Sequence, residues 1–578
     1  MDNNRVYFAN RENVSRFVNR WDFLLLILVF SVLFFLGWAS QQMATPYSLG
    51  EPLPISLDPG QLPFYASRTV LRMFIALTLS IVFTFVVGAL AAKNQRAEQV
   101  IIPAIDVLQS VPVLSFLAIT ITGFIHLFPG SLLGPECASI FVIFTAQVWN
   151  MTFSFYQSLK SVPADLHEVA SMFQLSAWQR FWKVEVPCTL SGLLWNMMMS
   201  MSASWFFVVV SEAIVVAHQD IRLPGVGSYI ALAIEQKDVQ AVGYAIFTMV
   251  VVIFIYDQIL FRPLIAWSEK FKMESSGEEE YQSWFIDLIR RSRLIKHVDT
   301  GWHILKDAMV NVQWLSHRTP KAVKEIDFNR QWHMDWIWNV IVLLVVITSA
   351  WLLFAYILSA VSQHEIFHAF LLGAATGTRV IVLIMLSSLL WIPVGVWIGQ
   401  RPGIAQKIQP VIQFAAAFPA NLFYPLFVIA IVRFNLSVEI WVTPLMILGT
   451  QWYILFNVIA GASMIPRDLC LVADNFGVTG WQWWRRLALP AIFPFYITGA
   501  ITAAGGAWNA SIVAEYVSWG NTSLKATGLG EYIQASTLAG DFHKIALGTA
   551  MMCIYVLIFN HLIWRPLYRL AQDRFNFN

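Results

Sequence analysis

Long apolar stretches follow one another along the whole sequence, each about 20 residues or more in length and separated by shorter polar segments. A helix of that length crosses a hydrocarbon core of about 30 Å. The pattern therefore predicts an all-α polytopic membrane protein with about twelve spans, six in each half of the chain. The expected spans lie near residues 21–38, 68–91, 99–127, 138–158, 188–216 and 241–263, and then near 336–360, 374–399, 408–432, 438–460, 489–517 and 544–564.

The two halves carry the same residue pattern at a nearly constant offset. Residues Glu168–Pro187 align with Leu471–Pro490 at an offset of 303 residues, and that offset holds downstream. Upstream the offset is 307, so that Arg72 meets Arg379, and a four-residue excess near residues 129–136 explains the change. An even number of spans per half predicts a parallel repeat. The expected division is a first transmembrane half at 1–266, a linker at 267–333 and a second transmembrane half at 334–578.

Composition and charge agree with a membrane protein and set its orientation. The chain is 57% hydrophobic and only 12% charged, about half the charged fraction that is usual for soluble proteins. With the N-terminus inside, 29 of the 37 Lys and Arg residues fall in cytoplasmic segments. This bias predicts that both termini are cytoplasmic. The basic residues then serve topology and contact with the lipid bilayer, and the net charge of +2 gives no reason to expect a nucleic-acid partner.

The linker at 267–333 differs from both halves because it holds 11 basic and 10 acidic residues. We expect it to be cytoplasmic, either with short amphipathic helices on the inner surface or as a solvated connector. The four cysteines are scattered singly, so that no disulfide framework is indicated.

Between spans four and five, each half has a polar and aromatic loop of about 30 residues. It begins at a helix-start signal, Pro163-Ala-Asp165 or Pro466-Arg-Asp468, and ends at the proline where we expect the next span to begin. A short amphipathic helix in this loop would lie across the bundle with its apolar face down, ready to meet a cytoplasmic partner. A plain interfacial helix is the alternative, but two copies at matched positions favour docking.

The loop residues resemble the signature of the permease subunits of bacterial ABC importers, which is Glu-Ala-Ala, three residues, Gly, about nine residues, and Ile-x-Leu-Pro. The first copy keeps Glu168, Ala170 and Pro187 but has Gln174 in place of the glycine. The second copy keeps Ala473, Gly477, Leu489 and Pro490 but has Leu471 in place of the glutamate. Together the two copies cover the motif, so that the chain looks like two permeases fused into one.

Further residues resemble the nitrate, sulfonate, taurine and bicarbonate branch of that family. They are the Trp-Gln of each loop at Trp178 and Trp481, the acid in span five, the later Gly-x-Gly, and the threonine three residues before an arginine in span two. The resemblance implies a fold with two parallel-repeat six-helix halves, like a type I ABC importer permease. It covers residues 66–266 and 374–570 but leaves out the linker.

The resemblance also implies partners, a location and a class of solute. The chain has no G-x-x-x-x-G-K-[ST] phosphate loop, so two copies of a cytoplasmic ABC ATPase subunit would carry the ATP and Mg. This chain itself would hold no cofactor and no metal. A periplasmic substrate-binding protein is usual in the family, and the location would be the bacterial inner membrane. The solute would be an oxyanion such as nitrate, sulfonate, taurine or bicarbonate. The implied coupling residues are Asp165, Glu168, Ala170, Gln174, Trp178, Pro187, Asp468, Ala473, Gly477, Trp481 and Pro490.

Two pairs of ionisable residues sit near the outer ends of spans two and five. We expect Arg72 to lie near Glu212, and Arg379 near Glu515, because each pair falls at one membrane depth and a carboxylate there needs a partner. An outer gate is one interpretation, and a static ion pair, snorkelled side chains or attraction of an anionic solute are the others. The candidate gate or pathway residues are Arg72, Glu212, Trp205, Arg379, Glu515 and Trp508.

Three weaker signals complete the picture. The Gly-x-Gly segments at 225–227 and 528–530 predict a turn that needs positive φ, or alternatively a loop that contacts a binding protein. Methionines 197–199 and 201 are expected to be packing residues. His364 and His368 have a spacing that a metal site permits, but no third ligand is evident.

An ion-gradient-driven secondary transporter is the alternative function, although mid-span acids are nearly absent. A membrane enzyme is a weaker alternative, because the sequence lacks a catalytic constellation.

Overall fold

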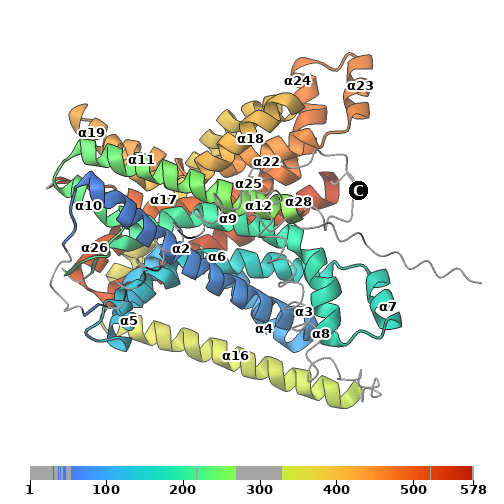
Figure 1. Ribbon diagram of the computed structural model, residues 1–578, viewed down its shortest axis with the longest axis horizontal. Helices are drawn as coiled ribbons and strands as arrows, with labels where there is room; N and C mark the ends of the chain where they lie inside the picture. Colours follow the sequence, from blue (N-terminus) through green and yellow to red (C-terminus); the bar gives the residue numbers. More distant parts are fainter. Residues whose placement is uncertain are drawn as a thin grey trace, which may run out of the picture.

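The computed structural model describes residues 54–216, 219–268, 328–520 and 522–575, together with residues 30, 37, 40, 43, 45 and 46 (Figure 1). Within these residues, eight helices are long and apolar enough to cross a membrane, and up to eleven spans result if each bent pair of helices counts as one. These eleven correspond to eleven of the twelve predicted spans. The remaining one, near 21–38, lies outside the described residues apart from two positions, and so does most of the predicted linker.

In the first half, the membrane helices follow each other with short connections. Their bounds are α2 (Leu62–Phe83), α3 (Ala89–Lys93), α4 (Gln95–Ser110), α5 (Leu117–Leu127), α6 (Leu133–Lys160), α9 (Val186–Glu212), α10 (Val226–Glu235), α11 (Val239–Tyr256) and α12 (Arg262–Ser268). Two short helices, α7 (Ala164–Met172) and α8 (Ala177–Arg180), join α6 to α9. A hairpin of β1 (Ala213–Val216) and β2 (Gln219–Arg222) joins α9 to α10.

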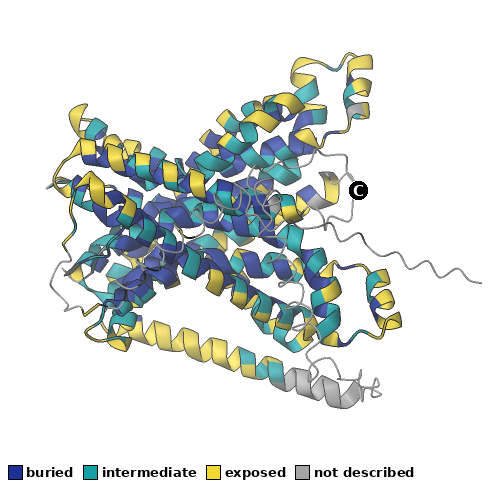
Figure 2. Ribbon diagram, viewed as in Figure 1, coloured by how far each residue is buried: buried dark blue, intermediate teal, exposed yellow. Residues whose placement is uncertain are grey.

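The second half repeats this order. Its helices are α16 (Phe328–Leu358), α17 (Gln363–Gly399), α18 (Pro402–Ala417), α19 (Tyr424–Arg433), α20 (Val438–Trp441), α21 (Thr443–Ile447), α22 (Gln451–Ser463), α25 (Leu489–Ala514), α26 (Leu529–Ala539), α27 (Phe542–Phe559) and α28 (Arg565–Phe575). The short helices α23 (Arg467–Asn475) and α24 (Gly480–Trp483) precede α25, and a hairpin of β3 (Tyr516–Trp519) and β4 (Thr522–Lys525) follows it. Helix α16 begins inside the predicted linker. Only 6% of its most apolar stretch, within Trp338–Leu358, is buried, so that the helix lies exposed along one edge (Figure 2).

Three predicted spans are bent rather than continuous. The span near 99–127 breaks by 90° between α4 and α5, and the span near 408–432 breaks by 76° between α18 and α19. Both breaks follow a proline, Pro112 or Pro419, that starts a short 3₁₀ helix, η4 (Val113–Phe116) or η8 (Ala420–Phe423). Proline lacks an N–H and disfavours the helical conformation of the preceding residue. The third bend, of 45°, lies between α21 and α22.

The bent helices interlock the two halves. The 3₁₀ helix η4 of the first half packs against α25 and α27, and η8 of the second half packs against α9 and α11. The two large hydrophobic clusters follow this exchange, because Val113 and Leu114 belong to a cluster made mostly of second-half residues, and Leu422 belongs to the first-half cluster. The hairpins are exchanged as well, since β1 packs against α26 and β3 against α10, with the Gly520 amide donating to the Ile234 carbonyl at 3.0 Å.

Four π-helical turns occupy matched positions in the halves. They are Phe181–Glu185 and Trp484–Ala488 before span five, and Asp257–Phe261 and Asn560–Trp564 in span six. Each ends two residues before a proline, because the proline ring clashes with the carbonyl four residues earlier and the wider turn relieves that clash. The prediction that span five begins at Pro187 and Pro490 is therefore wrong. The helical segments start at Ala177 and Gly480 and continue through these prolines.

Candidate functional site

The predicted coupling segments form helices α7 and α23, which project beyond the bundle at one end of the molecule, opposite to α10 and α26 (Figure 1). Ala170 and Ala473, at equivalent positions of the two helices, are buried. Large apolar side chains point outward instead, with Phe173 75% and Phe476 80% exposed. The expectation of an apolar face lying down on the bundle is therefore wrong. Each helix therefore ends in an exposed phenylalanine at the projecting end of the molecule.

The other predicted coupling residues surround these aromatic positions. Asp165 and Asp468 lie exposed in the first turns of α7 and α23, where a carboxylate is favoured by the helix dipole. Glu168 is exposed on α7, and Leu471, at the equivalent position of α23, is 60% exposed. Trp178 is half-buried with its ring against Trp182 at 5.6 Å, and Trp481 is exposed. The position that carries the carboxylate of Glu168 in α7 thus carries the apolar Leu471 in α23.

The motif glycine has a clear structural reason. Gly477 follows α23 with φ of 64°, in the left-handed region that ends helices, and Gln174 takes the same conformation after α7 with φ of 52°. A side chain in this region meets its own backbone, and only glycine avoids the clash. The first copy therefore keeps the left-handed turn although glutamine stands in place of glycine there.

The predicted pairing of Arg72 with Glu212 is confirmed. The Arg72 guanidinium lies 2.5 Å from Glu212 and 2.6 Å from Glu136, and all three side chains are almost completely buried. Thr69 Oγ1 donates to Glu212 at 2.7 Å and accepts from the Val226 amide at 3.1 Å. The pair thus belongs to a network that joins α2, α6, α9 and the start of α10.

The second half repeats this network, and the predicted pairing of Arg379 with Glu515 is also confirmed, at 2.8 Å. Arg379 forms a further ion pair with Glu439, and Thr376 Oγ1 donates to Glu515 at 2.9 Å. Glu439 stands 303 residues after Glu136, so that the second acid is also duplicated. The sequence reasoning missed both, although the downstream offset aligns them.

The two networks differ in charge. In the first half, buried Arg68 adds a second cation, 2.5 Å from Glu136, whereas Ala375 occupies the equivalent position in the second half. Glu136 is 1% exposed, while the Glu439 side chain, with one arginine fewer nearby, is 48% exposed. A carboxylate without a balancing cation is costly to bury, which accounts for the difference. Each network lies wholly inside one half, so its ion pairs hold the helices of that half together. Breaking of these ion pairs during transport stays a prediction.

The glycines of the two Gly-x-Gly segments belong to the same networks. Gly225 and Gly528 have φ of 179° and −174°, which is extended backbone, so the expected positive-φ turn is wrong. A Cβ on Gly225 would lie 2.2 Å from the carboxyl carbon of Glu212, and one on Gly528 would lie 2.2 Å from Oε2 of Glu515. The amide of the second glycine, Gly227, donates to Glu212 at 2.7 Å. Close approach to a buried carboxylate explains these glycines.

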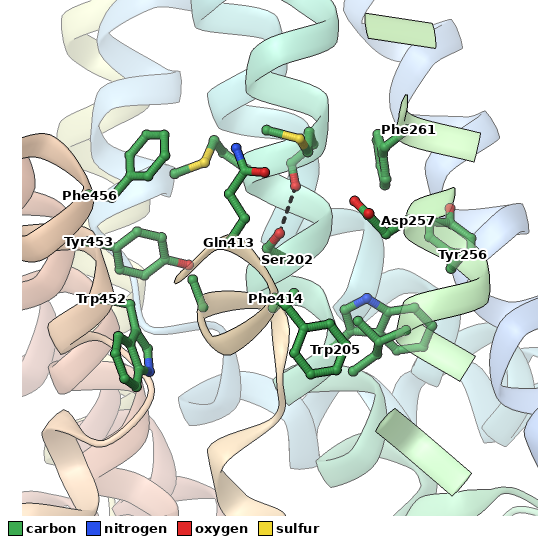
Figure 3. Close-up of a pocket in the computed structure, with 15 residues that line it drawn as sticks. Ser202, Trp205, Tyr256, Asp257, Phe261, Gln413, Phe414, Trp452, Tyr453 and Phe456 are labelled. Atoms are coloured by element: carbon green, nitrogen blue, oxygen red, sulfur yellow. Dashed lines mark hydrogen bonds between the residues drawn. The ribbon is translucent and has the colours of Figure 1, made fainter. Parts of the chain in front are cut away.

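A cavity of about 400 Å³ lies between the halves, lined by residues of both. Trp508 borders this cavity and packs edge-on against Phe559. Trp205 borders a smaller pocket (Figure 3) and packs edge-on against Tyr256, the first-half equivalent of Phe559. The predicted pathway tryptophans therefore do lie at the interface between the halves. Among the described residues, no three His, Cys, Asp or Glu side chains come together as a metal site, and this includes the surroundings of His364 and His368.

Comparison with known proteins agrees with this architecture. The sequence matches the family described as "binding-protein-dependent transport system inner membrane component" twice, over residues 84–262 and 391–573. These matches cover more than half of the chain, and the protein belongs to this family. It is therefore a multi-pass transport permease with a duplicated family domain.

Individual relatives are more distant. The chain is 25% identical to the nitrate import permease protein of Leptolyngbya laminosa over 200 residues, which are 35% of this chain and 68% of that protein. It is 26% identical to the bicarbonate transport system permease protein of a Synechocystis strain over 26% of this chain and 50% of the relative. It is 25% identical to the taurine transport system permease protein of Escherichia coli over 32% of this chain and 62% of the relative. Each match therefore covers between 26% and 35% of this chain, less than one of its two halves.

Proposed function

We propose that this chain is the complete translocation unit of an ABC importer, in which the two halves enclose one path for a small solute. Two copies of a cytoplasmic ATPase subunit would bind α7 and α23 and supply the ATP and Mg, and a periplasmic binding protein would deliver the solute. The relatives named for nitrate, bicarbonate and taurine support an oxyanion as the solute class.

One observation carries this proposal: two equivalent helices project from the same end of the molecule, each with an exposed phenylalanine. Burying a phenylalanine side chain contributes about 1.5–3 kcal/mol. Phe173 and Phe476 each offer such a contact, and a partner that closes on ATP would draw the two helices together. Because each half is fastened internally by its buried ion pairs, the movement would pass to the opposite end as a rigid-body rotation.

The experiment is reconstitution of the full chain in lipid vesicles with its ATPase subunit. We expect no ATP hydrolysis by the chain alone, hydrolysis with the subunit, and ATP-dependent uptake of solute. Replacing both Phe173 and Phe476 with serine should abolish binding of the ATPase subunit, while replacing Leu389, an exposed residue of α17, with serine should not. Robust hydrolysis by the isolated chain, or full ATPase binding by the double variant, would refute the proposal.

A further inference from the structure

One buried carboxylate in the first half joins three segments at the end of the molecule from which α7 projects. Glu185 is the last residue of the π-helical turn that leads into α9, and its side chain is only 5% exposed. Lys93, the last residue of α3, lies 2.8 Å from this carboxylate, and Arg180, the last residue of α8, lies 3.1 Å from it. Lys93 also stands over the ring of Phe181 at 4.5 Å. Glu185 therefore ties the end of span two and the start of span five to the segment that carries α7.

The second half has no charged junction at this place. At the two offsets, the residues equivalent to the carboxylate and its two cations are Ala488, Trp483 and Gln400. Ala488 is fully buried, and Trp483 packs edge-on against Trp484 at 5.5 Å, with both rings against the large second-half cluster. Apolar packing thus takes the place of the ion pairs. The signature Ile-x-Leu-Pro leaves the residue two before the proline open, so the resemblance assigns no role to Glu185.

The two coupling segments, residues 164–185 and 467–488, also differ where their second short helix begins. Before α8, the Gln179 amide donates to Ser176 Oγ at 3.2 Å, and the Ser176 amide donates to Gln179 Oε1 at 3.1 Å. This capping box satisfies two amides that a helix start otherwise leaves free. Before α24, Thr479 makes no side-chain capping bond, and the next residue is Gly480 with φ of 59°. Helix α8 is thus held at both of its ends by polar contacts that α24 lacks.

We propose that Glu185 is a positioning residue for transport, which fixes the first coupling segment to spans two and five. The movement of α7 then passes to these spans more directly than the movement of α23 passes to their equivalents. This inference rests on the importer function proposed above, in which an ATPase subunit moves each of the two helices. It goes further, because it makes the two halves mechanically unequal and names the residue responsible.

Burial explains why the carboxylate rather than either cation has this role. The side chains of Lys93 and Arg180 are 39% and 38% exposed, so water can hydrate each cation if its partner leaves. Glu185 is 5% exposed, and separation from its cations would leave a buried charge uncompensated. Glu185 also contacts both cations, so that its removal breaks both connections at once. The three segments are therefore expected to move together as long as the carboxylate is present.

The first test measures the mobility of each coupling segment in the full chain in lipid nanodiscs, with no partner present. In a chain whose four cysteines are replaced by alanine, a nitroxide spin label is attached through Met172→Cys or through the equivalent Asn475→Cys, since both residues are exposed. We expect the label on α7 to be the less mobile one. Glu185→Gln should raise its mobility to that of the label on α23, whose own mobility should not change. Lys160→Gln is the control, because the ion pair of Lys160 with Glu98 joins α6 to α4 outside the coupling segment.

The second test measures solute taken up per ATP hydrolysed, in vesicles with the ATPase subunit and with nitrate, bicarbonate and taurine supplied in turn. Glu185→Gln should lower this ratio at least about fivefold, the lower end of the coupling that is usual between linked sites. Binding of the ATPase subunit should not change, because the exposed face of α7 is unaltered. Glu185→Asp, which keeps the charge, should restore part of the ratio, and Lys160→Gln should leave it unchanged. If Glu185→Gln does not purify as a folded protein, Lys93→Met, which removes a half-exposed cation, should lower the ratio in the same direction.

Equal mobility of the two labels in the chain with Glu185 intact, or a ratio that Glu185→Gln leaves unchanged, would overturn the inference. The two tests also separate it from the proposed function. ATP-dependent uptake together with labels that do not respond to Glu185→Gln would leave the importer function standing and refute the role of Glu185. Labels that respond as expected, without ATP-dependent uptake of any solute, would support the fastening at Glu185 and refute the importer function.

Discussion

The carboxylate of Glu212 occupies the space that a side chain at Gly225 would need. A Cβ at this glycine would lie 2.2–2.4 Å from the three carboxyl atoms of Glu212, which are themselves held by Arg72, Thr69 and the Gly227 amide. The second half repeats the relationship between Glu515 and Gly528. A glycine in extended backbone is thus required by a buried charge.

Gly225→Ala should destabilise the protein, because the methyl group must displace a carboxylate that is fixed by three partners. We expect a loss of about 1–3 kcal/mol, as for overpacking in a core. Thermal unfolding of the detergent-purified chain measures it, with Gly243→Ala as a matched control, since a Cβ there meets nothing within 4 Å. Equal melting temperatures for the two variants would contradict this account.

Arg68→Ala should destabilise the first half strongly, because Glu136 is buried and would keep only one of its two cations. Removing a partner from a buried pair costs about 3–5 kcal/mol, and we expect the lower end since Arg72 remains. Lys160→Ala is the control, because the side chains of the Lys160–Glu98 ion pair are 46% and 28% exposed, and exposed pairs contribute at most about 1 kcal/mol. A smaller shift in melting temperature for Arg68→Ala than for Lys160→Ala would show that the buried cluster does not depend on Arg68.

Gln174→Gly should stabilise the protein, because it relieves the left-handed strain at φ of 52°, which costs about 1–2 kcal/mol in a residue with a Cβ. The added backbone freedom of the unfolded chain offsets about 0.4–1 kcal/mol of this gain. Gly477→Gln, the reciprocal change, should destabilise. Thermal melts of both variants provide the check, and shifts of the same sign would be inconsistent with a shared turn geometry.

Glu168→Lys should uncouple ATP hydrolysis from transport more than Leu471→Lys does, because only the first copy presents a carboxylate at this position. Both residues are exposed on their helices, so neither change should affect folding. The ratio of solute taken up to ATP hydrolysed, measured in vesicles with the ATPase subunit, decides the matter. Equal ratios in the two variants would mean that the two docking sites are equivalent in function.

Several features of the site followed from the sequence because they depend on position along a helix. The depth of Arg72 in span two and of Glu212 in span five placed them together, and the contact of 2.5 Å bears this out. Glu136 was missed because it stands at the edge of the loop where the offset changes, and only packing brings α6 against α2 and α9. The inward-facing apolar surface expected for α7 was wrong, because amphipathic periodicity does not reveal which face meets the protein.

The sequence by itself determined the class of fold, the spans now described and the duplication, since span length and repeated motifs are local properties of the chain. Tertiary structure decided how the halves meet. The 90° and 76° breaks after Pro112 and Pro419 send a segment of each half into the other, and periodicity cannot specify the direction that a chain takes after a break. Likewise, the cavity between the halves is lined by side chains of both, whose distances only the folded chain defines.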